Sequence, residues 1–350
     1  MRNRLSGDSE SALSPAENAA QWRSVIQAMI FPLFFVVMFS LCYVSAFHHP
    51  VPRDVGLVVV GPEVLTTQVM NQLNDSSPGS FAISTSTDLE GPLNDLASQK
   101  VSGVIELGST LTVHVASGGG AISAQAVEKV AQGIASASGV PMAIADVAPL
   151  SSGDSTGTAL FYFLVVCTVG GYITMTVVSQ VAPNMRVSRQ LGALGVMGVI
   201  LPTVAFAISS IFVGTYGATA SGLIVMVLIG MLYTIGIGLV SILATQLLGQ
   251  AAIFVVMTVA IFLNFPSSGG AIPAQFLPLF WEFLHHFWIG SGAMQSIRSV
   301  IYFDGAGLGG GLLILGSWAA VGLVLILLVS LRKNMQQKQL QVDDVQGVSA

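Results

Sequence analysis

Charged residues are scarce in this chain of 350 residues, since Asp, Glu, Lys and Arg make up only 8% of it. A soluble globular domain carries about a quarter of charged residues. The scarcity is also uneven, because Arg186 and Arg189 are the only charged residues between Asp154 and Glu282. A water-facing surface cannot be covered in this way, and 53% of the residues are hydrophobic. The composition therefore predicts an integral membrane protein.

Several motifs are absent as well, and each absence excludes a class of function. None of the four lysines follows a glycine, so the chain lacks the GxxxxGK[ST] loop that cradles nucleotide phosphates. Lys and Arg form no basic patch interleaved with aromatic residues, which excludes nucleic acid as a favoured partner. The long apolar segments contain no Asp, Glu, Lys, Arg or His, whereas ion-coupled carriers usually keep such residues there as relays. Any uphill transport would need energy from a partner.

Cysteine and histidine are too few to indicate catalysis or metal binding. Cys42 and Cys167 both lie in apolar segments, where packing is favoured over a redox role because reactive thiols need exposure. The pairs His48-His49 and His285-His286 lack a carboxylate or cysteine cluster that would complete a metal site. We expect no enzyme activity, no cofactor and no metal.

Six apolar segments are each close to or longer than the ~17 residues that cross a bilayer. They are residues 24–47, 157–181, 191–214, 220–247, 250–266 and 310–331. The fold class predicted is therefore an α-helical integral membrane protein with six transmembrane helices. Residues 1–23 are expected to form a cytoplasmic segment with a short amphipathic helix that starts at Ser14-Pro15-Ala16-Glu17. Residues 333–350 are expected to be a cytoplasmic tail.

Residues 48–155 differ in character, because charged and turn-forming residues return there. Short apolar runs at 55–60, 80–86, 101–107 and 111–115 predict strands, and the last two flank a Gly-Ser turn typical of a hairpin. Helices are expected from Pro62, over 89–98 and along 122–134, where apolar residues recur every four positions. The order βαβαββα predicts a compact α/β domain between the first and second spans.

The distribution of positive charge predicts the orientation. Cytoplasmic termini would place eight basic residues inside and four outside, as the positive-inside rule prefers. The inner set is Arg2, Arg4, Arg23, Arg186, Arg189, Arg332, Lys333 and Lys338, and the outer set is Arg53, Lys100, Lys129 and Arg298. We expect both termini in the cytoplasm of a bacterial cell, the chain in the plasma membrane, and an extracytoplasmic α/β domain.

Residues 272–303 are too broken by proline to be a clean span, and four phenylalanines recur there at spacings of four, three and four. This pattern predicts an amphipathic helix that lies in, or dips into, the outer leaflet. Two roles stay open, a lateral gate or vestibule wall and a plain membrane-surface anchor. The candidate outer gate comprises Phe276, Phe280, Glu282, Phe283, Phe287 and Arg298.

Two stretches carry a resemblance to a known family. The first runs from His48 to Gly61 (HHPVPRDVGLVVVG), where the first span passes into the first strand. The second starts at Ile272-Pro-Ala-Gln-Phe and continues through Gly290 and Arg298 to Tyr302-Phe-Asp-Gly. With the order of spans, they resemble ABC-2-type transporter permeases, in particular the phage-infection-protein-like (YhgE/Pip) branch.

The resemblance implies export of hydrophobic, amphipathic or lipid-like compounds. It also implies a separate ATP-binding subunit and a homodimer or a paired permease in the lipid bilayer. Coupling to that subunit would fall to Trp22, Arg23, Arg186 and Arg189, although the arginines are also ordinary positive-inside anchors. A membrane-anchored receptor or scaffold, whose outer domain binds a partner without transport, remains the alternative.

Overall fold

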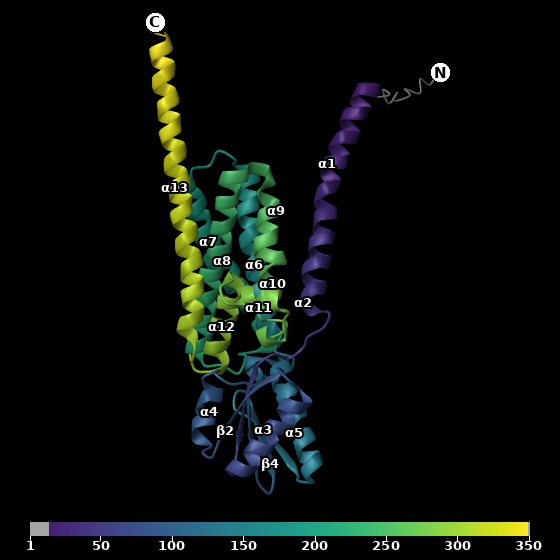
Figure 1. Ribbon diagram of the computed structural model, residues 1–350. Coiled ribbons are helices and arrows are strands. Elements are labelled where there is room, and N and C mark those ends of the chain that lie inside the picture. Colours follow the sequence, from purple (N-terminus) through teal and green to yellow (C-terminus); the bar gives the residue numbers. More distant parts are fainter. Residues whose placement is uncertain (1–13, 349–350) are drawn as a thin grey trace, which may run out of the picture.

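The computed structural model describes residues 14–348 as a helical bundle with an α/β domain at one end (Figure 1). Both ends of the described chain lie at the opposite end of the bundle. Arg2 and Arg4, which were assigned to the cytoplasm, lie outside the described residues. The domain follows the first apolar helix, as the composition predicted.

Five helical segments of the described chain are long and apolar enough to cross a membrane. Four are single long helices: α1 and its continuation (Pro15–Phe47), α6 (Ala159–Val181), α7 (Val187–Val213) and the apolar part of α13 (Leu308–Gln336). The fifth segment is Ala220–Ser267. These helices are compatible with a multi-pass membrane protein, and the bounds of α6 and α7 lie within four residues of those expected.

The fifth segment combines two of the six spans expected from the sequence. Helix α8 (Ala220–Leu248) ends at Gly249, whose φ of 55° lies in the left-handed region. The chain then returns beside α8 through a 3₁₀ turn (Gly249–Ala251) and α9 (Ala252–Met257). A π-helical turn (Thr258–Phe262) and α10 (Asn264–Ser267) complete this return leg. At 1.5 Å per residue, residues 252–267 are about 24 Å long, shorter than the ~30 Å hydrocarbon core.

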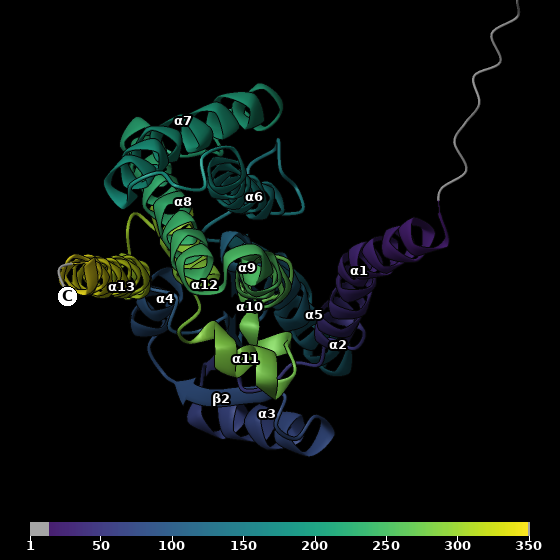
Figure 2. The ribbon, with the colours of Figure 1, turned by 90° about the horizontal axis from the view of Figure 1, so that it is seen from above.

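The N-terminal helix differs from its prediction. Ser14 forms the expected capping box, since it accepts from the Glu17 amide while its own amide donates to the Glu17 carboxylate. However, α1 (Pro15–Phe39) continues without a break through Trp22, so the separate surface helix expected before residue 24 is wrong. A π-helical turn (Ser40–Val44) and α2 (Ser45–Phe47) follow. Most of α1 stands apart from the bundle (Figures 1 and 2).

The last helix also exceeds its prediction. Helix α13 runs over Leu308–Val348, so the expected tail from residue 333 continues the span as helix. At this end Lys333 donates through Nζ to the carbonyl oxygen of Gln246, 2.6 Å away on α8. The contact ties α13 to the bundle near the turn between α8 and α9.

The α/β domain has one more strand than the sequence indicated. Its elements are β1 (Val55–Val60), α3 (Glu63–Ser76), β2 (Phe81–Ser86), α4 (Glu90–Ala97), β3 (Gly103–Glu106), β4 (Leu111–Val115), α5 (Ala121–Ser138) and β5 (Met142–Asp146). The sheet order is β2-β1-β3-β4-β5, with an antiparallel hairpin between β3 and β4 and parallel pairs elsewhere. Strand β5 was missed because it is a short, alanine-containing edge strand without a clear apolar run.

The segment between α10 and α13 is not the single amphipathic helix that was expected. It comprises a 3₁₀ turn (Ala274–Phe276), α11 (Leu279–His285) and α12 (Ile289–Tyr302). Ten of the 14 residues of α12 are buried, because this helix packs against α8 and α13 inside the bundle. It lies in the half of the bundle next to the α/β domain. Prolines break the expected helix, since Pro278 separates the 3₁₀ turn from α11.

Candidate functional site

A cavity of about 630 Å³ lies between α6, α7, α8 and α9. Its lining includes Pro183 from the α6–α7 loop and Gln250 from the turn before α9. These connections lie at the end of the bundle that carries both chain ends. We call this cavity the vestibule. Its volume falls within the ~300–1,000 Å³ typical of small-molecule sites.

The vestibule is lined by uncharged polar side chains. They are Thr176, Ser179, Gln180, Gln190, Ser241, Thr245 and Gln250, next to Ile253 and Val256. Four of the hydroxyls already donate to carbonyls of their own helices, at 2.8 to 3.1 Å. Their oxygens therefore present lone pairs to the cavity. The lining suits a molecule that carries neutral hydrogen-bonding groups together with apolar surface.

Deeper in the bundle, three polar side chains form a hydrogen-bonded layer. Asn264 donates through Nδ2 to the Tyr233 hydroxyl at 2.6 Å, and Tyr233 lies 2.6 Å from the Thr168 hydroxyl. Thr168 itself donates to the carbonyl of Leu164, so the Tyr233 proton points to Thr168. All three side chains are buried. We call this set the buried layer.

The buried layer closes the vestibule on the side of the α/β domain. Each residue of the layer lies eight positions from a residue that lines the vestibule. The vestibule residues are Thr176 on α6, Ser241 on α8 and Val256 on the return leg. Eight helical residues span about 12 Å. Tyr233 and Phe262 are among the largest fully buried side chains, so the path is filled at this depth. The bundle is thus hollow at one end and closed toward the other.

The layer also contacts the first turn of α12. A Cβ added at Gly290 would overlap the Oδ1 atom of Asn264, so the two residues are in close contact. The same Oδ1 is buried and has no hydrogen-bond partner among the described residues. The carboxamide oxygen therefore lies at the electropositive start of α12, which has no side-chain N-cap hydrogen bond. A shift of α12 would therefore change the contact between Gly290 and Asn264 in the buried layer.

Two basic side chains hold the turn that follows α10. Arg298 donates to the carbonyl oxygens of Gly269 and Gly270, at 2.9 and 3.3 Å. His285 Nδ1 lies 2.8 Å from the carbonyl oxygen of Ser267, so it donates there. Burial lowers the pKa of Arg298 to about 10, which leaves the guanidinium charged at neutral pH. Burial also lowers the pKa of His285, which favours the neutral ring.

The α/β domain rests on this same segment. The amide of Arg53 donates to Gln275 at 2.8 Å, and Gln99 donates to the carbonyl of Ala306 at 3.0 Å. Gly118 packs so closely on the ring of Tyr302 that a Cβ there would overlap it. The domain is therefore attached to the chain on both sides of α11 and α12.

The residues of the predicted outer gate do not form one surface. Phe280 and Phe283 are exposed on α11, and Phe287 is exposed just after this helix, with 5.2 Å between the ring centroids of Phe283 and Phe287. Phe276 instead lies in the 3₁₀ turn and is buried. Glu282 is partly exposed, and its backbone oxygen accepts from His286. Arg298 lies on α12 and holds the turn after α10, away from the role assigned to it.

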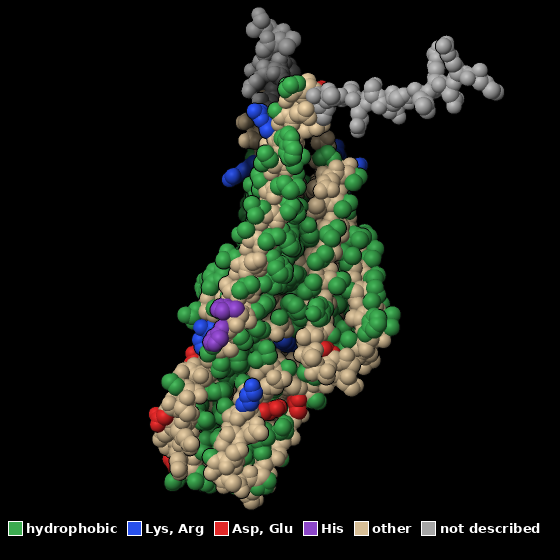
Figure 3. All heavy atoms as spheres, turned by 90° about the vertical axis from the view of Figure 1, so that its right-hand side faces the viewer, with side chains coloured by type: hydrophobic (Ala, Val, Ile, Leu, Met, Phe, Trp, Pro, Cys, Tyr) green, Lys and Arg blue, Asp and Glu red, His purple; other side chains and the backbone are tan. Residues whose placement is uncertain are grey.

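The four predicted coupling residues are also separated into two groups. Trp22 and Arg23 lie on the part of α1 that stands apart from the bundle (Figure 2). Arg186 is the N-cap residue of α7, and Arg189 lies in the first turn of that helix. All four lie toward the end with the chain termini. Figure 3 shows an apolar belt between Lys and Arg side chains at that end and Asp and Glu side chains over the α/β domain.

The sequence did not single out the vestibule or the buried layer. Their residues are Ser, Thr, Gln, Tyr and Asn, which also occur singly within ordinary apolar spans. A usable signal was present, since Thr176, Ser179 and Gln180 lie on one side of a helix, as do Ser241 and Thr245. Comparisons with family models, with curated proteins and with solved structures found no match. The functional argument therefore rests on the geometry of this site.

Proposed function

We propose that this chain is the membrane subunit of a transporter for uncharged or amphipathic molecules, driven by a separate ATP-binding subunit. The observation that carries the proposal is a vestibule with a neutral polar lining, closed by the buried layer. A protein that alternates access to a site needs a cavity open at one end and a closure toward the other. The resemblance to ABC-2-type permeases favours export.

The same proposal includes the orientation and the full number of spans. The vestibule end carries Arg186, Arg189 and Lys333, and the positive-inside rule makes this end cytoplasmic. In the proposal the short return leg from α9 to α10 is the fifth of six spans, and α11 and α12 form a separate segment on its outer side. The plasma membrane of a bacterium is the membrane in question, and the α/β domain faces outward.

The charge content of the spans supports an external energy source. Within the five candidate spans, no acidic or basic side chain lies in residues 24–47, 159–181, 190–213, 220–267 or 308–331. An ion-coupled carrier would need such groups as relays. The ATP-binding subunit would dock at the end with Arg186 and the start of α1, and a second copy of the chain completes the permease.

Access to the vestibule gives a first test of the proposal. Thr245→Cys would be placed in the vestibule lining, with Ile208→Cys on the exposed side of α7 as a control for lipid-facing positions. Native Cys42 and Cys167 are both buried and free. We expect a membrane-impermeant maleimide to modify the thiol introduced by Thr245→Cys in inside-out vesicles and not in right-side-out vesicles. Modification from the outer side alone would overturn the orientation.

Transport itself is tested by filling the vestibule. We expect Thr245→Trp to abolish ATP-dependent efflux of a neutral amphiphile, N-phenylnaphthylamine, from cells that express the chain with its ATPase. Ile208→Trp adds the same ring on the lipid side and should retain efflux. The ATPase should co-purify with the chain in mild detergent. Failure of both co-purification and efflux would leave the chain without a transport function.

A further inference from the structure

A second hollow lies in the α/β domain, far from the vestibule. Two adjoining cavities of about 440 and 310 Å³ run between α3 and α5. They share Val69, Gln72 and Ile134, so they form one continuous trough. It is open because α3 packs on β1 and β2, whereas α5 packs on β3, β4 and β5. The two helices cover the same side of the sheet and leave their facing surfaces unpaired.

The wider part of the trough lies where open α/β sheets bind their ligands. Pro62 follows strand β1, and Leu107 follows strand β3; both line this part. Strands β1 and β3 are parallel neighbours, and the strand order changes direction between them. In open α/β sheets the crevice outside the carboxyl ends at such a switch point is the usual ligand site. Its position thus favours binding independently of its lining.

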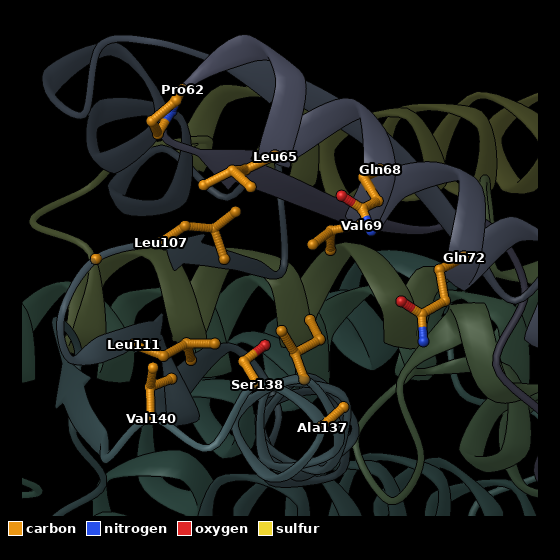
Figure 4. Close-up of a pocket in the computed structure, with 12 residues that line it drawn as sticks. Pro62, Leu65, Gln68, Val69, Gln72, Leu107, Leu111, Ala137, Ser138 and Val140 are labelled. Atoms are coloured by element: carbon orange, nitrogen blue, oxygen red, sulfur yellow. The ribbon is translucent and has the colours of Figure 1, made fainter.

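The lining of the trough is aliphatic with a polar edge. Leu65, Val69, Leu107, Leu111 and Ile134 supply the apolar surface, and Figure 4 shows the labelled side chains among these facing one another across the wider part. The amides of Gln68 and Gln72 lie along one side. Such a lining stabilises an apolar chain by removing its surface from water.

One charge marks the narrower end of the trough. Lys129 is the only charged residue that lines either cavity, and it makes no ion pair within residues 14–348. It is joined there by Ser76, Ser77 and Gly133. From Lys129 to Ser138 the trough follows α5 for nine residues, which is about 13 Å. An elongated apolar hollow with a single cation at one end complements a chain with an anionic head.

We propose that this trough binds a single-chain amphiphile with a carboxylate head, a fatty-acid-class molecule. The acyl chain lies on Leu107, Leu111 and Ile134, and the carboxylate lies at Lys129 with the serines. A nucleotide does not fit, because the lining offers no glycine-rich phosphate loop and no second cation. The proposal does not depend on the transport function, since the trough belongs to the outer domain.

Cysteine protection in the full chain tests the site. Gly133→Cys places a thiol in the trough, and a Cβ at this position meets no atom within 4 Å, so the change fits. Gln132→Cys is the matched control, because Gln132 is exposed on the same helix and lines neither cavity. We expect laurate to slow maleimide modification of the Gly133→Cys variant in a saturable manner and to leave the Gln132→Cys variant unaffected. Ala137→Cys repeats the measurement in the wider part if Gly133→Cys does not fold.

The head group is tested with Lys129→Gln and an uncharged analogue. We expect the substitution to raise the laurate concentration needed for half protection by only about threefold, because an exposed ion pair contributes little in water. Protection by dodecanol should be weaker and should not respond to the substitution. Equal protection by both compounds would refute the preference for a carboxylate head. Equal slowing in the Gln132→Cys and Gly133→Cys variants would refute binding in the trough. Protection without laurate that rises with protein concentration would assign the trough to a protein partner instead.

Discussion

Tyr233 is the centre of the buried layer, and replacing it with phenylalanine tests the contribution of that layer. Tyr233→Phe removes one oxygen and keeps the ring, so the packing of this fully buried side chain is preserved. The hydroxyl accepts from Asn264 Nδ2 at 2.6 Å. Without it the Asn264 amide has no acceptor, and its Oδ1 already lacks a partner among the described residues. The Thr168 hydroxyl keeps its bond to Leu164.

The expected loss follows from these contacts. A buried donor left without a partner costs about 1–3 kcal/mol in soluble proteins, and hydrogen bonds between membrane helices average about 0.6 kcal/mol with a maximum near 1.7. We therefore expect Tyr233→Phe to lower the free energy of unfolding by about 1–2 kcal/mol. Tyr172→Phe on α6 is the matched control, because the described contacts give its hydroxyl no hydrogen bond, and we expect about 0.5 kcal/mol or less.

Reversible unfolding in mixed micelles, followed by tryptophan fluorescence, measures both variants. A double-mutant cycle with Asn264→Leu adds a sharper criterion, since two partners of one hydrogen bond should show a coupling of about 1 kcal/mol. Equal stability of the two tyrosine variants, together with zero coupling to Asn264, would refute the role given to the buried layer. Additive losses of similar size would mean that Tyr233 and Asn264 stabilise the bundle independently.

Three further predictions concern the segment between α10 and α13 and the domain that rests on it. Gly290→Ala should lower the midpoint of thermal unfolding, because the added Cβ overlaps Asn264 Oδ1. Burial lowers the folded-state pKa of His285 below 6.5, so the unfolded state binds more protons; stability should fall as the pH drops below about 6.5, and His285→Gln should reduce this pH dependence. Gly118→Ala should loosen the α/β domain, because its Cβ overlaps the Tyr302 ring, and hydrogen exchange should rise along their contact while the bundle stays protected.

Much of the fold follows from the sequence, because the bilayer leaves few alternatives. Uncharged runs longer than a bilayer crossing must be helices, since every backbone polar group has to be satisfied within the segment. The change of composition at residues 48–155 separated the α/β domain, and the hairpin between β3 and β4 is confirmed by their antiparallel pairing. The capping box at Ser14 is also confirmed, because it depends on residues within one turn.

The errors arose where contacts distant in sequence decide the structure. The phenylalanine spacing predicted one surface helix, yet Pro278 interrupts it and α12 is buried among α8 and α13. Arg298 was assigned to a gate, whereas its hydrogen bonds hold the turn at Gly269 and Gly270, 29 and 28 positions away. No local pattern indicates which carbonyls a buried arginine will reach.

The sequence by itself indicated several helices long and apolar enough to cross a membrane and a separate α/β domain, because charge and hydropathy act locally and sum along the chain. Only the tertiary structure decided where the hollows lie. The vestibule and the buried layer combine single polar residues from α6, α8 and the return leg. The trough exists because α3 and α5 pack on different strands and leave a space between them. Both depend on how the helices pack together, which the separate segments do not encode.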